Sequence, residues 1–550
     1  MAAKWWPSTL FVLLAVFNNK HVSSDGLPPT CDSEVYCYGD LLHVVQTAGI
    51  FPDSKTFVDM SMLREPRHIL DDFEHLLAEN NGNLTKQQVQ TFVDANFKSD
   101  LELEDWVPPD FTPFPSFLKD VTDEDMRTFA WNVIAIWPKL TRRIKQTVSE
   151  HPSRHSIIYL PNGIVVPGGR FRESYYWDTY WIIKGLLASE MHTTARGLLD
   201  NFVHLIKTYG FIPNGGRVYF TRRSQPPLFT SMSMEYFKYT GNITWVRRNI
   251  EFMEKEVLSW QSQMIKVGKH MLARYLPKST GPRAESYKED YTLAMRFPER
   301  ERDRVYVDLK ACAESGWDFS SRWFYGGAGG NLSQLHTGRT LPVDLNAYLG
   351  KCYHDLAHFY SVLGNPIKQN YWNVEYDKMK YAIYDVFWNE TDGTWYDFDL
   401  KQNVHRRQFF PSNLAPLWAG IHHDGSVHDF VYDYLQRSGI FDYLGGTPAS
   451  TQQTGEQWDY PNAWAPLQDI IITALRRGNQ KSREMAARLA RLWVTANAIG
   501  FKNSGELFEK YDALVPGRYG GGGEYIVQAG FGWTNGLALD LITKYFTRTN

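Results

Sequence analysis

Apolar residues recur at three- and four-residue spacing through most of the chain. This is the period of an amphipathic helix with one buried face, and it differs from the alternation of a half-buried strand. Gly or Asn follows most of these segments, as is typical of helix C-termini. The pattern predicts an all-α protein with helices over 124–148, 194–210, 244–264, 344–364, 369–388, 466–478 and 482–501.

Long loops rich in Gly, Pro and aromatic residues separate the predicted helices, and loops of this length in a compact domain are usually functional. They cover 161–173, 210–228, 276–290, 326–342, 443–464 and 514–533. Because the loops recur every one or two helices, the simplest architecture is a ring of helical hairpins with the loops gathered at one end. No linker interrupts the chain after the N-terminal part, so we expect one domain over 25–550, in which 25–110 is an arm and 111–550 the ring.

The N-terminus has the pattern of a secretory signal peptide. Lys4 supplies the positive charge, Trp5 to Phe17 the apolar core and Val22-Ser23-Ser24 the small-residue exit, so we expect residues 1–24 to be removed. No apolar run is long enough to span a membrane, and the polar ending TKYFTRTN has no anchor signal. We therefore expect a secreted, extracellular protein without a membrane anchor.

Four glycosylation triplets agree with secretion, because such acceptors occur in surface loops of secreted proteins. They begin at Asn83, Asn242, Asn331 and Asn389. Four cysteines allow three pairings, between which the sequence does not choose. Cys31 with Cys37 would close a small loop, whereas Cys312 and Cys352 could pair or stay as buried thiols.

Charge and composition exclude some classes of partner. The net charge of -3 leaves no broad basic surface, so we expect no nucleic-acid partner. No Cys/His cluster has zinc spacing, so we expect neither a metal nor another cofactor. Aromatic residues make up 15% of the chain, with 19 Trp, and such side chains favour surfaces that are apolar on one side and wet on the other.

The loop PGGRFRESYYWDTYW (167–181) combines Arg170, Phe171, Trp177 and Asp178. A guanidinium offers a planar fork of donors, a carboxylate accepts hydrogen bonds, and aromatic faces stack on the C–H faces of a sugar ring. A structural interpretation is equally open for this stretch alone, with the aromatic residues in the core of a helix N-terminus. The loops IPNGGRVYFTRRSQPP (212–227) and GPRAESYKED (281–290) add further arginines and carboxylates.

Three carboxyl groups in later loops favour sugar chemistry. Asp318 lies between Trp317 and Phe319, and aromatic neighbours desolvate a carboxyl and raise its pKa, as a general acid requires. Glu509 and Glu524 flank the run Gly520–Gly523. No Lys-Ser or Lys-Thr follows this run, so a loop that closes over a neutral ligand fits better than a phosphate loop. Because paired carboxylates are the minimum apparatus of a glycosidase, the motifs indicate a carbohydrate-active enzyme.

These loops closely resemble those of the trehalases. PGGRFRESYYWDTYW and QWDYPNAWAPLQ match the two diagnostic motifs of that family, and the other loops match its remaining blocks in order, from about residue 160 to 540. Ala284 stands where the family often has Pro. The resemblance implies an (α/α)6 toroid that hydrolyses α,α-trehalose to two glucose molecules with inversion and without a metal.

The resemblance also implies residue roles. Asp318 matches the general acid, Glu509 the general base, and Arg170, Arg223 and Arg283 three essential arginines. The matching substrate contacts are Trp177, Asp178, Asn214, Ser224, Gln225, Glu285, Gly316 and Glu524, with Ala284 contributing through its backbone. Phe171 and Trp458 are the further aromatic candidates of their loops. The Gly520–Gly523 run would belong to a lid that closes over the sugar.

One electrostatic conflict follows, because three nearby arginines should lower the pKa of Asp318 while a general acid must stay protonated. Burial against Trp317 and a like charge on Glu285 or Glu314 would have to oppose them. Two alternatives stay open: an inactive sugar-binding protein on the same scaffold, and another toroidal hydrolase or lyase that acts on longer glycans. We expect a monomer whose partner is trehalose.

Overall fold

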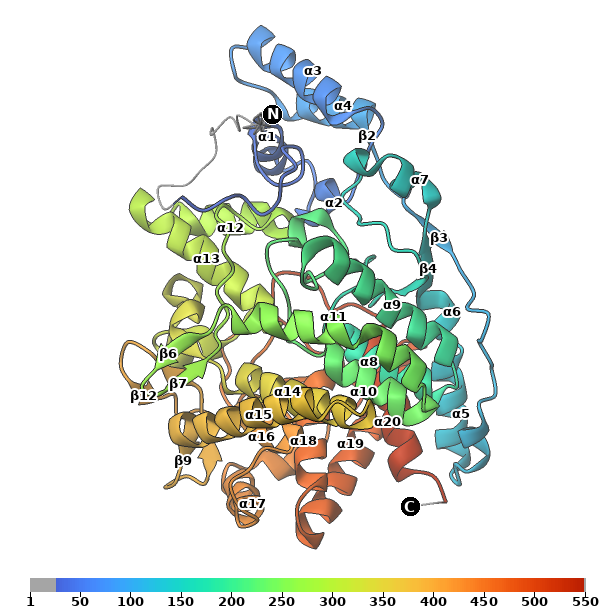
Figure 1. The fold of residues 1–550 in the computed structure, drawn as a ribbon. Coiled ribbons are helices and arrows are strands. Elements are labelled where there is room, and N and C mark those ends of the chain that lie inside the picture. Colours follow the sequence, from blue (N-terminus) through green and yellow to red (C-terminus); the bar gives the residue numbers. More distant parts are fainter. Residues whose placement is uncertain (1–25, 549–550) are drawn as a thin grey trace, which may run out of the picture.

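The computed structural model describes residues 26–548, so the predicted signal peptide lies outside the described residues. Helices dominate this part of the chain, and the strands are short (Figure 1). Six helices form a closed inner ring in which each contacts the next and the last contacts the first. They are α8 (Asp178–Ala188), α10 (Phe229–Thr240), α14 (Val343–Val362), α16 (Ala415–Ala419), α18 (Ala465–Arg476) and α20 (Gly532–Tyr545).

Six outer helices surround this ring; five of them pack directly against an inner helix, and α17 packs against the outer helix α19. They are α5 (Glu124–Ile134), α9 (His192–Tyr209), α11 (Ile243–Gln261), α15 (Pro366–Phe387), α17 (Val427–Arg437) and α19 (Gln480–Ser504). The predicted (α/α)6 toroid is therefore confirmed. Its core is one hydrophobic cluster that runs from Leu118 to Ile542.

The predicted helix over 124–148 is wrong in its length. Helix α5 ends at Ile134, and only the single turn α6 (Trp137–Leu140) and the short α7 (Gln146–Glu150) follow, separated by strand β4 (Thr141–Ile144). Pro138 lies in the middle of the predicted segment, where it lacks the N–H that a continuous helix needs. The break lets β4 pair with β3 (Leu103–Asp105) and β5 (Ile164–Val165).

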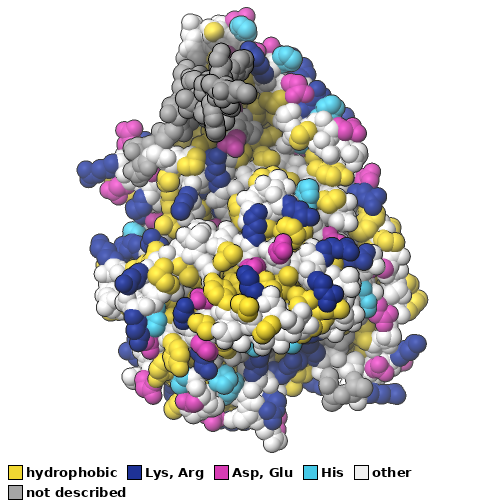
Figure 2. Space-filling view, in the orientation of Figure 1, with side chains coloured by type: hydrophobic (Ala, Val, Ile, Leu, Met, Phe, Trp, Pro, Cys, Tyr) yellow, Lys and Arg dark blue, Asp and Glu magenta, His cyan; other side chains and the backbone are white. Residues whose placement is uncertain are grey.

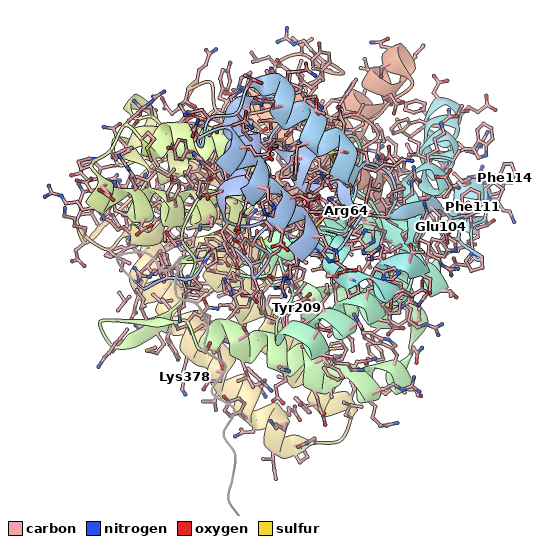
Figure 3. All side chains as sticks on the ribbon, turned by 90° about the horizontal axis from the view of Figure 1, so that it is seen from above. Arg64, Glu104, Phe111, Phe114, Tyr209 and Lys378 are labelled. Carbon is pink, nitrogen blue, oxygen red and sulfur yellow. A yellow bond between two sulfur atoms is a disulfide. The ribbon has the colours of Figure 1, made fainter. Side chains whose placement is uncertain are left out.

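The arm lies at one end of the molecule, at the top of Figure 1 and nearest the viewer in Figure 3. It contains α1 (Asp40–Ala48), α2 (Lys55–Val58), α3 (Pro66–Glu79) and α4 (Lys86–Asn96), and β1 (Ser61–Met62) pairs with β2 (Phe97–Lys98). A second hydrophobic cluster joins the arm to Tyr175, Phe220 and Ala284, which lie in the ring's loops. The arm is thus packed on the loops rather than on the outer helices.

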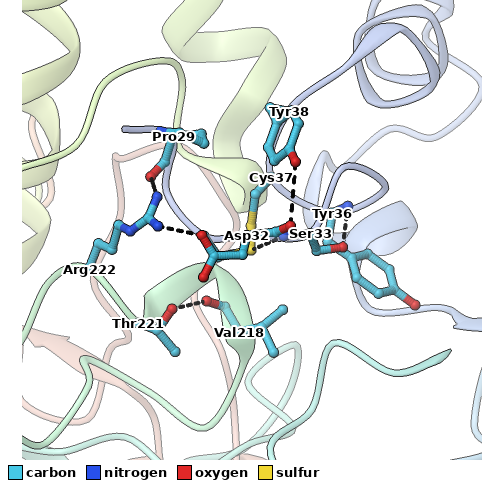
Figure 4. Close-up of a disulfide and its surroundings, with 10 residues drawn as sticks. Pro29, Asp32, Ser33, Tyr36, Cys37, Tyr38, Val218, Thr221 and Arg222 are labelled. Atoms are coloured by element: carbon cyan, nitrogen blue, oxygen red, sulfur yellow. Dashed lines mark hydrogen bonds and ion pairs between the residues drawn. A yellow bond between two sulfur atoms is a disulfide. The ribbon is translucent and has the colours of Figure 1, made fainter. Parts of the chain in front are cut away.

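A disulfide between Cys31 and Cys37 lies at the start of the arm (Figure 4). Beside it, Arg222 donates hydrogen bonds to the Pro29 carbonyl and, at 2.5 Å, to the Asp32 carboxylate. Cys312 and Cys352 are buried free thiols. The arm is therefore tied to the loop that also carries Arg223.

The remaining elements connect the ring's loops. Helices α12 (Tyr287–Ala294) and α13 (Glu299–Ser315) lie next to the arm in Figure 1, and α12 contacts α1. Strand β13 (Asn462–Trp464) pairs with β14 (Lys510–Asp512). The other strands are β6 (Ile265–Val267), β7 (His270–Leu272), β8 (Thr340–Leu341), β9 (Trp388–Asn389), β10 (Thr394–Trp395), β11 (Phe398–Asp399) and β12 (Val404–His405). On the face shown in Figure 2, basic and acidic side chains are interspersed, in keeping with the small net charge. No helix of the described residues is long and apolar enough to cross a membrane.

Candidate active site

A cavity lies where the arm meets the predicted functional loops, and Lys55 of the arm is one of its lining residues. Its walls carry both candidate catalytic carboxyls and all three candidate arginines. Most of the predicted contacts line it: Phe171, Trp177, Asp178, Asn214, Gln225, Glu285, Gly316, Trp458 and Glu524. Residues from widely separated parts of the chain therefore converge on one site.

Asp318 follows the C-terminus of α13, and a glycine makes the turn that brings it to the cavity. Gly316 ends the helix with a left-handed φ of 78°, and a Cβ there would lie 2.6 Å from the Trp177 indole. Both the backbone conformation and the close packing therefore require glycine. Beyond Asp318, the Phe319 carbonyl accepts a hydrogen bond from the Trp458 backbone N–H at 3.0 Å, which fixes the loop against the QWDYP segment.

Burial raises the pKa of the Asp318 carboxyl to about 6. Its side chain retains 34% of its surface, but this surface faces the enclosed cavity. The positive charge of Arg283, whose Nη1 lies 4.0 Å from Oδ2, opposes the rise in pKa, and Arg223 does so more weakly. Glu285 adds to the rise, as one of the two expected like charges, whereas Glu314 is engaged elsewhere and accepts a hydrogen bond from the Ser224 N–H at 2.8 Å.

Glu509 immediately precedes β14 and is almost completely buried, with 2% of its surface exposed. Its Oε1 accepts a hydrogen bond from the Tyr525 hydroxyl at 2.7 Å, and its Oε2 accepts one from the Gln528 N–H at 3.3 Å. Burial raises the pKa of Glu509, while the positive charge of Lys510 and the bond from Tyr525 lower it. The two donors favour the ionised form, which is the form a general base needs.

Each of the three arginines is paired with a carboxylate. Arg170 donates through Nε and Nη2 to the two oxygens of Asp53, both at 2.7 Å. Arg223 donates to Asn214 at 2.7 Å and to Glu285 at 2.5 Å. The charges in the cavity wall are therefore largely compensated inside the protein.

The third arginine, Arg283, has two acidic partners. Its Nη2 donates to Asp290 at 2.7 Å and to Glu524 at 3.1 Å. Burial raises the pKa of Glu524 to about 7, against the lowering effect of Arg283. The Glu524 backbone is exposed, but its carboxyl turns inwards to Arg283 and Ser286.

The Gly-rich loop (residues 520–530) closes one side of the cavity. Gly522 has a φ of 74°, and a Cβ there would lie 2.5 Å from the Gly455 carbonyl oxygen. Asn462 exchanges two hydrogen bonds with the backbone of Gly521, at 2.8 and 3.0 Å, and Lys510 donates to the Gly522 carbonyl at 3.2 Å. Glycine is needed here because the loop's backbone, rather than its side chains, contacts the neighbouring strand pair.

Indole rings form one wall of the cavity. Trp458 stacks on Trp464 with ring centroids 3.9 Å apart and an angle of 2°, and Trp177 and Trp533 pack against the pair. Asp178, at the start of α8, is buried beneath them, and burial together with the charges of Glu509 and Asp318 raises its pKa well above the ordinary value. Such a wall offers apolar faces for stacking and a carboxyl that can donate a hydrogen bond.

Two predicted contacts lie behind the wall. The Ser224 hydroxyl donates to the Ile212 carbonyl at 2.7 Å, and the Ala284 carbonyl accepts a bond from Gln46 of the arm at 3.4 Å. Conversely, Lys55, Tyr525 and Trp464 line the cavity without having been singled out from the sequence. Trp464 lies inside the quoted motif QWDYPNAWAPLQ, and Tyr525 directly follows Glu524 in the predicted loop 514–533, so a local signal existed for both. Nothing near Lys55 in the sequence indicates a site.

The four glycosylation triplets have different surroundings. Asn83 and Asn331 are exposed, whereas Asn242 and Asn389 are half-buried. Nδ2 of Asn242 contacts the Tyr236 hydroxyl at 3.2 Å, and Nδ2 of Asn389 contacts His405 at the same distance. A glycan on either of these two asparagines would replace one of the two Nδ2 hydrogens and leave the other for that contact.

An enclosed cavity with carboxyls, guanidinium groups and indole faces suits a neutral polyhydroxylated ligand, and its position at the mouth of a helical toroid is that of an (α/α)6 glycoside hydrolase. Comparison with known proteins identifies the group within this class. Residues 49–546 match the family model named Trehalase, and the chain belongs to that family.

Two relatives and one solved structure illustrate this membership. Over 532 aligned residues the chain is 46% identical to a Trehalase of Tenebrio molitor, covering 94% of this chain and 96% of that protein. It is 43% identical to a Trehalase of Homo sapiens, covering 100% of this chain and 95% of the other. The structure of neutral trehalase Nth1 from Saccharomyces cerevisiae superposes with a TM-score of 0.62 over 78% of this chain and 95% of that chain, at 20% identity, which supports the fold.

Proposed function

We propose that the protein hydrolyses α,α-trehalose to two glucose molecules by an inverting mechanism, with Asp318 as general acid and Glu509 as general base. The observation that carries this proposal is the contrast between the two carboxyls in one cavity. Burial raises the pKa of both carboxyls, that of Asp318 to about 6, but at Glu509 the charge of Lys510 and the hydrogen bonds from Tyr525 and Gln528 oppose the rise and favour the ionised form. Such divergent environments are what an acid–base pair needs.

In the proposed reaction, Asp318 gives its proton to the glycosidic oxygen while the bond from that oxygen to the anomeric carbon breaks. Glu509 takes a proton from a water molecule, whose oxygen attacks the anomeric carbon from the opposite face. One glucose is released as the β anomer and the other keeps the α configuration. Transfer of a proton from Glu509 to solvent, and of one from solvent to Asp318, restores the starting state.

Two buried polar atoms in the wall support a sugar as the ligand. Among the described residues, Arg223 Nη1 and Glu285 Oε2 have no hydrogen-bond partner, although both residues line the cavity. An unsatisfied buried donor or acceptor is costly, and sugar hydroxyls can satisfy both kinds. The Gly-rich loop would act as the lid that excludes bulk water once the sugar is bound.

The test is a turnover assay on trehalose, maltose and a glucose polymer, with NMR detection of the first anomer released. Release of equal β- and α-glucose from trehalose supports the proposal. Initial release of α-glucose alone would refute inversion, and binding without turnover would indicate a sugar-binding protein. A crystal structure with a bound inhibitor should place the Asp318 and Glu509 carboxyls roughly 6.5–9.5 Å apart; about 5 Å would indicate retention.

We further propose that the protein is a secreted glycoprotein. The predicted signal peptide motivates this, and the Cys31–Cys37 disulfide supports it because such bonds persist in oxidising compartments. Expression in animal cells should deliver the protein to the medium with its N-terminus near residue 25, and glycosidase treatment should reduce its mass. Retention of the untrimmed chain inside the cell would contradict the proposal.

A further inference from the structure

The arm contributes an acidic side chain that holds one of the cavity's arginines. Asp53 receives Nε and Nη2 of Arg170 in a bidentate pair, with both distances 2.7 Å. This geometry is the strongest form of a charge-assisted pair, because two parallel bonds fix the plane of the guanidinium. Within the described residues, Arg170 Nη1 has no acceptor, and Arg170 lines the cavity.

Arg170 also contacts Tyr525, which donates a hydrogen bond to the proposed base, Glu509. Its guanidinium lies over the Tyr525 ring, 4.8 Å from the centroid, and the Tyr525 hydroxyl donates to Glu509 at 2.7 Å. The Arg170 backbone N–H is fixed separately by Gln528 at 2.8 Å. A continuous chain of contacts therefore runs from Asp53 through Arg170 and Tyr525 to Glu509.

The arm segment around Asp53 is itself held in place by the ring's loops. The Ser54 hydroxyl donates to Glu289 at 2.8 Å, and Lys55 forms an ion pair with the buried Glu173 at 2.9 Å. Arg217 donates to the same Glu173 at 2.8 Å. The segment is thus fixed on both sides, so that Asp53 presents its carboxylate at a defined position.

A second cavity shares Arg170 and Lys55 with the first. Asp53, Asp59, Asp100 and Glu102 also line it. Lys55, Arg217 and Arg172 bind the carboxylates of Asp59, Glu102 and Asp100, respectively, whereas Asp53 binds Arg170. Arg170 therefore lies between the two cavities, and its bidentate pair with Asp53 sets the orientation of its guanidinium.

We propose that Asp53 is a positioning residue that locks the Arg170 guanidinium towards the substrate, so that the active site is incomplete without the arm. This inference rests on the proposed function of the cavity. The charge of Arg170 in turn lowers the pKa of Asp53, against the effect of burial, so the carboxylate stays ionised at any pH at which the enzyme would work. The Arg170 Nη1 is left to donate to a sugar hydroxyl.

The test compares Asp53→Asn with the matched variant Asp100→Asn. Asp100 is also an arm aspartate paired with an arginine of the same loop, Arg172, but Arg172 does not line the first cavity. Asp53→Asn removes the charge and one of the two bonds, so we expect kcat/KM on trehalose to fall about ten- to hundredfold. Asp100→Asn should stay within about twofold of the parent.

Two further variants separate positioning from a general structural loss. Asp53→Glu should recover at least part of the activity, because the second cavity leaves room for a longer carboxylate. In an Arg170→Lys background, Asp53→Asn should lower kcat/KM on trehalose by less than about threefold. A residue that acts through Arg170 loses its effect when the planar guanidinium is replaced by an ammonium group. The inference would be overturned if Asp53→Asn lowered kcat/KM in the Arg170→Lys background as much as it does in the parent, or if Asp53→Glu recovered no activity.

The parent protein distinguishes the two proposals. If the parent hydrolyses trehalose and Asp53→Asn matches it in kcat/KM, the positioning role is wrong and the proposed function stands. If the parent has no turnover on trehalose, the proposed function fails, and this inference fails with it.

Discussion

The proposed roles of the two carboxyls determine how activity should depend on pH. Catalysis requires Asp318 to be protonated, and burial raises the pKa of this carboxyl to about 6. About half of the molecules then carry the proton at pH 6, about one in eleven at pH 7 and about one in a hundred at pH 8. We therefore expect kcat/KM to fall about tenfold per pH unit above pH 7.

The acidic limb should belong to Glu509, which must be ionised. Burial raises the pKa of Glu509 above its ordinary value, while Lys510 and Tyr525 limit the rise. Activity is then lost as the pH falls through this raised pKa. The result is a narrow bell on the acidic side of neutrality, whose two apparent values belong to the coupled pair.

Glu524 lies in the same cavity, and burial raises its pKa to about 7. Its titration could therefore also produce the alkaline limb of the pH profile. The assay is therefore the kcat/KM profile of the parent, Asp318→Asn and Glu524→Gln on trehalose and on a glucosyl fluoride, whose leaving group needs no proton. Asp318→Asn should lose the alkaline limb and be impaired far less on the fluoride. Glu524→Gln should keep the limb. Equal impairment of Asp318→Asn on both substrates, or loss of the limb in Glu524→Gln, would refute the assignment.

Three further predictions concern the arginines, the base and the Gly-rich loop. Arg223→Ala and Arg283→Ala should each lower kcat/KM by about a hundredfold or more while circular dichroism shows an intact fold. The corresponding Lys variants should recover little activity because Lys lacks the planar fork of donors. Near-parental kinetics in either Ala variant would show that this arginine does not act on the substrate. Glu509→Gln should lose the acidic limb from its remaining activity, and a limb that persists would assign it to another group. Gly522→Ala should lower both activity and, by about 1–2 kcal/mol, the free energy of unfolding, because its φ is 74° and its Cβ would meet the Gly455 carbonyl. Gly521→Ala, whose Cβ meets nothing within 4 Å, is the control, and equal effects in the two variants would contradict this reasoning.

The 3.6-residue period predicts the outer helices and also two inner helices, α14 and α18, which are largely buried. The outer helices α9, α11, α15 and α19 were expected within a few residues, because their exposed sides make the 3.6-residue period visible. Helix α8 was missed, since every residue from Asp178 to Ala188 is buried and the polar half of the pattern is absent. Helix α20 was missed for the same reason, being buried from Gly532 to Ile542.

The candidate site was predictable where chemistry is local to a motif. Asp318 between two aromatic residues, and Glu509 and Glu524 around a glycine run, carry their signals in a few neighbouring letters. Asp53 could not be found in this way, because 117 positions separate it from Arg170 and nothing around it is unusual. The arm was expected only as an appendage, and its part in the cavity wall is visible only once the chain is folded.

The paired arginines resolve the electrostatic conflict that the sequence raised. Three uncompensated guanidinium groups would hold the pKa of Asp318 low and leave no acid at the site. In the folded protein Asp53, Glu285 and Asp290 each neutralise one of them, while the planar forks remain in the wall. The arginines can therefore supply directional donors to a neutral sugar at little electrostatic cost to the acid, and burial is left as the dominant influence on Asp318.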